Sequence, residues 1–316
     1  MKVRSNPRAP WKSLRGDLSE APEWVPVDLR HNPVMPADPT TLNRRRRVFR
    51  QLVAAGCKEI AVGQPALSQA DFSFVRTLLR EDLIPDHVTL SVFTPAHRDR
   101  IRRTFESIAG LDRAVVHLSA TTPLALGNEL HIDHGTLLGL VRAAGEDMMR
   151  CAGGRAGVRF QYSVGGFGPA EADFTLEVCD SMTFLWEAST DRPVILNFPA
   201  TASTTAPDAY AQRINFVNHH LTQRPHVILS ADPRNDQGTA SACAELALSA
   251  GAQRVEGRLL GDASRTDDAD LAALATSLAE QGIDPKIDVP GAGSGAVLPG
   301  VMSRRRGSTR PVQIPS

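Results

Sequence analysis

Short apolar runs rich in β-branched residues alternate along this chain with longer segments whose apolar residues recur at helical spacing. Runs such as Val227-Ile228-Leu229 show little polar alternation, which is typical of parallel strands covered on both faces. The predicted strands are residues 24–29, 59–62, 87–93, 114–118, 158–162, 193–197, 226–230 and 254–256. Each is followed by a predicted helix, at residues 40–55, 68–80, 96–108, 132–151, 169–184, 207–223, 236–250 and 267–281.

Repeated strand–helix units predict a (β/α)8 TIM barrel, an α/β fold formed by a single domain over residues 21–288. An open doubly wound sheet is the alternative, although no predicted strand is followed by a glycine-rich phosphate-binding turn. Residues 1–20 and 289–316 lack periodicity, and we expect them to form flexible tails. Ser68 and Asp267 are expected N-caps, and Asp236 and Thr239 are both expected to cap the helix at residues 236–250.

Composition and charge describe a globular protein with no preference for a polyanion. The 316 residues are 42% hydrophobic, and their formal net charge is zero. No apolar run has the length of a membrane span, and four widely separated cysteines favour buried thiols. We therefore expect a cytoplasmic protein that binds neither nucleic acid nor membrane, with a small carboxylate and at most a second copy of the chain as partners.

Polar residues gather where the predicted strands end, which is where a TIM barrel holds its active site. Any barrel presents some polar residues there, so this pattern is weak evidence when taken alone. The candidates are Arg30 and His31 after the first strand, His117 in the fourth, Thr201 after the sixth, Asp232 and Arg234 after the seventh, and Asp262 and Arg265 after the eighth.

A set of collinear motifs resembles the 2-isopropylmalate synthase family, which belongs to the DRE-TIM metallolyase type. The resemblance covers about residues 21–288, and chance does not produce so long a series in order. The matching segments are Ala21-Pro22-Glu23-Trp24-Val25-Pro26-Val27-Asp28-Leu29-Arg30, Lys58-Glu59-Ile60-Ala61-Val62-Gly63-Gln64-Pro65, Ala114-Val115-Val116-His117, Asn197-Phe198-Pro199-Ala200-Thr201, Leu229-Ser230-Ala231-Asp232-Pro233-Arg234-Asn235-Asp236 and Val255-Glu256-Gly257.

Membership would imply a barrel that joins the acetyl group of acetyl-CoA, or another acyl-CoA, to a 2-oxo acid with the help of a divalent metal. Arg30, His117, Thr201 and Arg265 keep the family's residues and are the expected substrate contacts. Family enzymes continue beyond the barrel into further domains, whereas this chain is expected to comprise the barrel alone.

The departures from the family fall at the metal ligands. His31 replaces an aspartate, and Asp232 and Arg234 replace two histidines. Gly165 replaces a glutamate after the fifth strand, and Asp262 lies in an altered loop after the eighth. The resemblance therefore points to Arg30, His31, Asp232 and Arg234 as the candidate catalytic residues.

Charge leaves two interpretations of this altered site open. Asp232, Asp262 and Arg234 together carry a charge of about −1, which one divalent ion would turn into about +1. A metal, if bound, would be held by His31, Asp232 and Asp262. We favour a metal-free site in which Arg234 pairs with Asp232 or Asp262, because a guanidinium beside a ligand repels a cation. We also expect Asp28 to hold Arg30.

The sequence thus predicts a divergent isopropylmalate synthase-like barrel that binds a small carboxylate or 2-oxo acid. Its reaction would be carbon–carbon bond formation by acyl-CoA condensation, or the corresponding cleavage, in a specialised biosynthetic pathway. The alternative is a catalytically silent barrel that binds a ligand or a partner, which the loss of ligand residues favours.

Overall fold

The computed structural model describes residues 18, 20–30, 39–119, 133–164, 172–200, 206–260 and 268–289. Eight strands form one parallel sheet in the order β1-β8-β7-β6-β5-β4-β3-β2. They are β1 (Glu23–Pro26), β2 (Glu59–Ala61), β3 (Thr89–Pro95), β4 (Ala114–Ser119), β5 (Val158–Ser163), β6 (Val194–Pro199), β7 (Val227–Asp232) and β8 (Arg254–Gly257).

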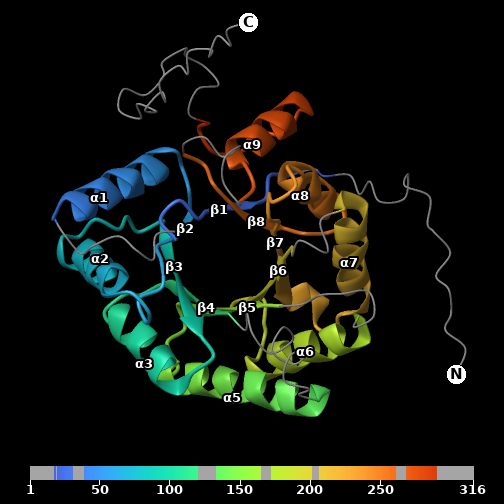
Figure 1. The fold of residues 1–316 in the computed structure, drawn as a ribbon, viewed down its shortest axis with the longest axis horizontal. Helices are drawn as coiled ribbons and strands as arrows, with labels where there is room; N and C mark the ends of the chain where they lie inside the picture. Colours follow the sequence, from blue (N-terminus) through green and yellow to red (C-terminus); the bar gives the residue numbers. More distant parts are fainter. Residues whose placement is uncertain are drawn as a thin grey trace, which may run out of the picture.

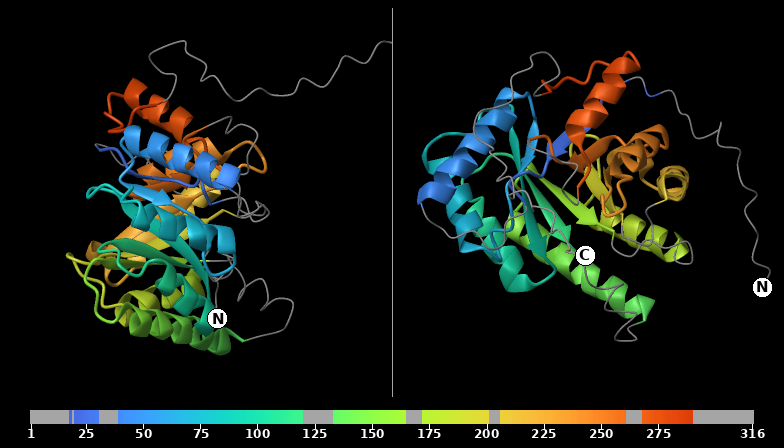
Figure 2. Two further views of the ribbon diagram at one scale, coloured as in Figure 1. Left: turned by 90° about the vertical axis from the view of Figure 1, so that its left-hand side faces the viewer. Right: turned by 45° about the horizontal axis from the view of Figure 1, so that its top comes forward.

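The sheet curves into a ring, with β1 and β2 side by side at the closure (Figure 1). Among the described residues, eight α-helices follow the strands in turn and surround the ring, and Figure 2 shows this outer layer from two further directions. They are α1 (Pro39–Ala54), α2 (Gln69–Arg80), α3 (Arg98–Ser107), α5 (His134–Ala152), α6 (Ala172–Leu185), α7 (Pro207–His220), α8 (Ala240–Ser249) and α9 (Leu271–Glu280), with a short 3-10 turn η4 (Arg224–His226) before β7. The predicted (β/α)8 barrel is confirmed, and the open sheet is excluded.

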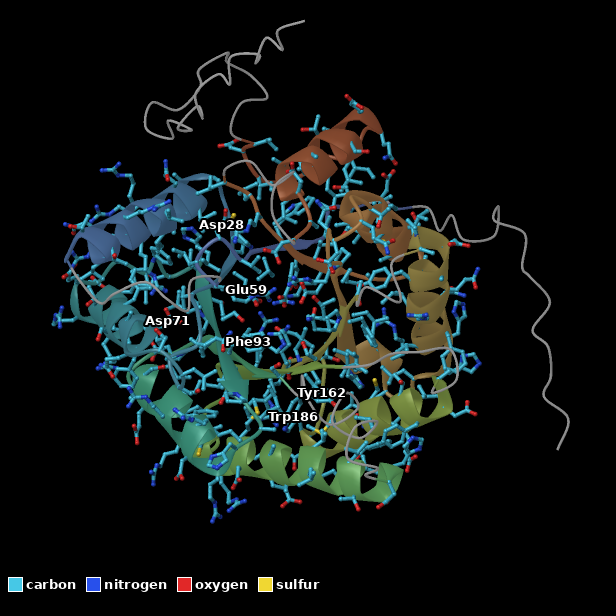
Figure 3. The ribbon with its side chains drawn as sticks, in the orientation of Figure 1. Asp28, Glu59, Asp71, Phe93, Tyr162 and Trp186 are labelled. Atoms are coloured by element: carbon cyan, nitrogen blue, oxygen red, sulfur yellow. The ribbon has the colours of Figure 1, made fainter. Side chains whose placement is uncertain are left out.

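Alternation along each strand divides apolar from polar side chains. In β5, Phe160 and Tyr162 face the helices, where Phe160 packs against Trp186 with ring centroids 5.1 Å apart. Figure 3 shows Tyr162 and Trp186 between the strands and the helices, whereas Glu59 and Phe93 lie on the inner side of the ring. The apolar core therefore lies outside the ring, and much of the interior is polar.

The predicted strands and helices agree with the observed bounds to within four residues, and the largest differences fall at the starts of α8 and α9. Ser68 caps α2 as expected, since its side chain accepts a hydrogen bond from Asp71 N. Of the two residues expected to cap α8, Thr239 is the N-cap and Asp236 is not, because the helix begins at Ala240. The expected cap of α9 is wrong, since Asp270 takes the place of Asp267. In both cases the chain remains non-helical for a further turn beyond the expected start.

The described residues show no sign of a membrane-spanning helix, because none of their helices combines sufficient length with sufficient apolarity. None of the four cysteines forms a disulfide, and Cys57, Cys179 and Cys243 are buried. The expected flexible tails at residues 1–20 and 289–316 lie almost wholly outside the described residues, so their character stays a prediction.

Candidate functional site

Arg30 occupies the mouth of the barrel, just beyond the end of β1. Its Nη1 donates to Glu256 Oε2, and its Nη2 lies 3.4 Å from Asp232 Oδ1 and 3.9 Å from Asp268 Oδ1. The Arg30 side chain is only 9% exposed. Burial opposes its charge, but the three carboxylates outweigh burial and raise its pKa above the usual value. Arg30 is therefore a permanent cation fixed by residues from the opposite end of the sequence.

Arg254 forms a second charged layer deeper in the barrel. This fully buried side chain donates to Ser230 Oγ at 2.7 Å, Glu256 Oε1 at 2.9 Å, Glu59 Oε1 at 2.6 Å and Gln161 Oε1 at 3.0 Å. Burial acts to raise the pKa of Glu256, but Arg30 and Arg254 dominate and hold it well below its usual range. Glu256 is thus an ionised carboxylate that joins the two arginine layers.

The ladder of charges continues to the far end of the barrel. Arg159 Nη2 lies 3.2 Å from Glu59 Oε2. Arg159, Glu59, Arg254, Glu256, Arg30 and Asp232 therefore alternate in sign from one end of the barrel interior to the other. Each buried charge has a partner of opposite sign, which is the condition under which such charges are tolerated in a folded core.

His117 is a neutral member of this interior. Its Nε2 lies 2.6 Å from Ser163 Oγ and 3.3 Å from Gln161 Nε2, and its ring packs against Phe93 with centroids 3.9 Å apart. Burial lowers the pKa of His117 to about 3. Because the Gln161 amide nitrogen can only donate, Nε2 accepts, and the Ser163 hydroxyl donates to it as well. The expected contact of His117 with substrate stays a prediction.

Asp232 ends β7 and receives two donors. Its Oδ1 faces Arg30, and its Oδ2 accepts from Asn197 Nδ2 at 3.2 Å. Burial raises the pKa of Asp232, against the opposing effect of Arg30. Arg30, 202 positions away in the sequence, pairs with Asp232. Asp262, the other expected partner of Arg234, lies outside the described residues, so the expected pairing of Arg234 with Asp232 or Asp262 stays a prediction.

Arg234 lies higher at the mouth, and a third of its side chain is exposed. Its Nη2 lies 3.8 Å from Asp236 Oδ1, and its backbone forms an isolated bridge with Asp268. Residues two positions apart point to the same face only within a strand. Because β7 ends at Asp232, this rule does not extend to Arg234.

Asp28 does not hold Arg30, contrary to expectation. Its carboxylate accepts from Leu259 N at 3.1 Å and from Leu260 N at 2.8 Å. It lies beyond the end of β1 and anchors the segment that leaves β8. Arg258, which directly follows β8, pairs through its Nε with Asp268 Oδ2 at 3.1 Å.

Four of the predicted site residues, and the altered family position after β5, lie outside the described residues: His31, Thr201, Asp262, Arg265 and Gly165. Arg30, His117, Asp232 and Arg234 are described. The structure brings the first three into one hydrogen-bonded interior, and Arg234 lies above it.

Of the three expected metal ligands, Asp232 belongs to the described residues, and His31 and Asp262 lie outside them. Within the described ranges, no group of three His, Cys, Asp or Glu side chains is arranged to hold a metal ion. Asp232 offers a carboxylate, but the Arg30 guanidinium bonded to it would repel a cation there.

Arg254 and Glu256 are the central residues that the sequence analysis did not single out as site residues. A signal was present, because Arg254-Val255-Glu256 places two charged residues at a spacing of two in a strand of a fully covered sheet. Such a spacing puts both side chains on the same face, and in a barrel only the interior can hold two opposite buried charges together.

Comparison with known proteins agrees with this architecture. The family model described as HMGL-like matches residues 21–291. A 2-isopropylmalate synthase from Nocardia farcinica is 50% identical over 280 residues, which cover 88% of this chain and 48% of the relative. One from a Parafrankia species is 43% identical over 284 residues, which cover 86% of this chain and 49% of the relative. The chain thus spans about half the length of these curated relatives.

Solved structures support the fold independently. The HMG-CoA lyase from Brucella melitensis superposes with a TM-score of 0.60 at 16% identity, covering 86% of this chain and 94% of that chain. An HMG-CoA lyase from Bacillus subtilis gives a TM-score of 0.61 at 15% identity, with 86% and 89% of the two chains covered. Because the family model matches residues 21–291, which are most of this chain, the chain belongs to the HMGL-like family.

Proposed function

We propose that this barrel binds a small carboxylate at its mouth and catalyses carbon–carbon bond formation or cleavage next to that carboxylate. An acyl-CoA is the proposed cosubstrate, in keeping with the relatives named 2-isopropylmalate synthase. The observation that carries the proposal is Arg30, a cation at the strand ends held rigidly by Glu256 and Asp232.

Arg30 is suited to two tasks. A guanidinium has several N–H donors in a planar fork, so bonds to Glu256 and Asp232 still leave it capable of donating to a ligand carboxylate. Its fixed position also suits it to stabilise negative charge that develops on an oxygen during bond formation. Thr201, Arg265 and His117 are the proposed additional contacts of the substrate.

Arg234 and His31 complete the proposed set of reacting residues. Arg234 lies at the mouth above Asp232, where it can meet the acidic part of an acyl-CoA or a second carboxylate. No reaction step is assigned to a metal, because the described donors do not suit one.

Thiol release from acetyl-CoA, measured over a panel of 2-oxo and 2-hydroxy acids, tests the catalytic part of the proposal. Thermal-shift measurements on the same acids test binding. Replacement of Arg30 with Met should abolish both signals, and Arg30→Lys should retain part of the binding because it keeps the charge without the fork. Arg98→Met, which changes an exposed arginine, is the matched control. Unchanged thermal shifts in a folded Arg30→Met protein would show that the ligand lies elsewhere.

A catalytically silent, ligand-binding barrel is the second candidate. The observation that favours it is the pairing of Asp232 with Arg30 at a position where the resemblance implies a metal-binding histidine. This candidate predicts thermal shifts with small carboxylates, but no thiol release with any acyl-CoA and acid pair.

A further inference from the structure

Asn197 is a buried residue of β6 with one unsatisfied atom. Its side chain is fully buried, and its Nδ2 donates to Ser163 Oγ at 3.1 Å and to Asp232 Oδ2 at 3.2 Å. Its Oδ1 is buried and has no hydrogen-bond partner. Buried carbonyl oxygens are nearly always satisfied, so an orphaned one next to the candidate site calls for a ligand or water that donates to it.

The orientation of this amide follows from its neighbours. An ionised Asp232 can only accept, so the Asn197 nitrogen must face it. Ser163 donates its single proton to His117 Nε2, and its oxygen therefore also needs a donor from Asn197. If the amide were rotated by 180°, Oδ1 would face the oxygens of Asp232 and Ser163, which have no proton to donate to it. Asn197 Oδ1 is thus fixed as an acceptor pointing away from Asp232 and Ser163.

The ends of β6 and β7 therefore present acceptors to a ligand. Asp232 contributes a carboxylate, and Asn197 contributes its carbonyl oxygen. The family resemblance implies the opposite polarity here, with two histidines and a cation that would attract the lone pairs of a ketone. In this chain a ketone oxygen would meet only oxygens from these two residues, and a hydroxyl or ammonium group would find two acceptors.

We propose that the site selects a small carboxylate whose neighbouring carbon carries a hydrogen-bond donor, a hydroxyl or a protonated amine, in place of a ketone. This inference rests on the proposed function, because it assumes that the ligand carboxylate is bound at the same mouth. A ligand hydroxyl would donate its one proton to Asn197 Oδ1, whereas an ammonium group could donate one proton to Asn197 Oδ1 and another to the Asp232 carboxylate.

Calorimetric titration with acids of one carbon skeleton tests the selection. Pyruvate, lactate, alanine and propionate differ only at the carbon beside the carboxylate, and a branched five-carbon set with the same substituents covers a larger ligand. Lactate or alanine, or its five-carbon counterpart, should bind at least about ten-fold more tightly than the matching ketone, since a site built to accept a donor strongly rejects an analogue that lacks it.

Asp232→Asn identifies which donor the site takes. It keeps the shape of the side chain and removes the charge, so an amino acid should lose about ten-fold or more in affinity, and a hydroxy acid should lose less. Asp99→Asn, at a carboxylate on α3 that is 69% exposed, should change neither affinity and is the matched control.

The failures of the two proposals are distinguishable. If the ketone or the unsubstituted acid binds as tightly as the donor-bearing acids, with or without added Zn²⁺ or Mn²⁺, donor selection is overturned and the carboxylate-binding function stands. If none of the acids of either set binds, the carboxylate-binding function itself is overturned, and the inference with it.

Discussion

Replacing Arg254 with Met probes the charge ladder that fills the barrel interior. The substitution keeps the length and much of the volume of the side chain but removes hydrogen bonds to Ser230, Glu256, Glu59 and Gln161. Glu256 keeps Arg30 and Glu59 keeps Arg159, so neither carboxylate is left without a cation. Breaking a buried ion pair usually costs about 3–5 kcal/mol, and the remaining partners place the expected loss near the lower figure, about 3 kcal/mol.

Equilibrium urea unfolding followed by circular dichroism measures this loss. Arg98→Met is the control, because Arg98 is 72% exposed where it pairs with Asp147, and such surface pairs contribute less than about 1 kcal/mol. The double variant Arg254→Met with Glu59→Gln should recover part of the lost stability, since it removes a carboxylate that Arg254 neutralised.

The pH dependence provides a second signature of the same perturbation. Without Arg254, the folded-state pKa of Glu256 should rise relative to the parent. The folded variant then binds more protons than the folded parent as the pH falls toward the ordinary glutamate pKa of 4.5, so its stability deficit relative to the parent should shrink below about pH 5. A loss below about 1 kcal/mol, or a deficit that grows on acidification, would refute the proposed ladder.

Three further predictions concern single residues. Burial lowers the pKa of His117 to about 3, so its ring NMR signals should not titrate between about pH 5 and 8, and a normal titration would contradict its burial. Because the unfolded chain takes up this proton near pH 6.5, His117 should reduce stability as the pH falls below about 6.5. Asp28→Ala should lower the unfolding free energy by about 1–3 kcal/mol, because Leu259 N and Leu260 N lose their acceptor, and an unchanged melting temperature would contradict that role. Arg234→Ala should cost less than about 1 kcal/mol in urea unfolding, and a larger loss would mean that Arg234 compensates buried charge.

The barrel was predictable because its strand–helix alternation is local and repeated. Predicted strands such as residues 226–230 and 254–256 fall within two residues of β7 and β8, since apolar β-branched runs between turn residues have few other solutions. The helix caps were less predictable, because more than one polar residue precedes α8 and α9, and tertiary packing selects which one stops the chain.

The partners of the buried charges were harder to predict, because they are distant in sequence. Arg234 lies two positions from Asp232, and proximity favoured that pair. Arg30 reaches Asp232 across 202 positions and Glu256 across 226, because β1 pairs with β8 in the sheet and β8 with β7. Asp28 and Arg30 are also close in sequence but do not pair, since Asp28 accepts from Leu259 N and Leu260 N and Arg30 donates to Glu256.

Arg30 and Asn197 both bond to Asp232, and we infer that Asp232 therefore serves as a hydrogen-bond acceptor at the mouth and not as a metal ligand. Elemental analysis of the purified protein, combined with calorimetric titration of Zn²⁺, Mn²⁺ and Mg²⁺, tests it most directly. We expect no stoichiometric metal ion in the parent protein and no saturable binding of these ions that depends on Asp232. One tightly bound divalent ion per chain, lost in Asp232→Ala and retained in Asp236→Ala, would contradict it.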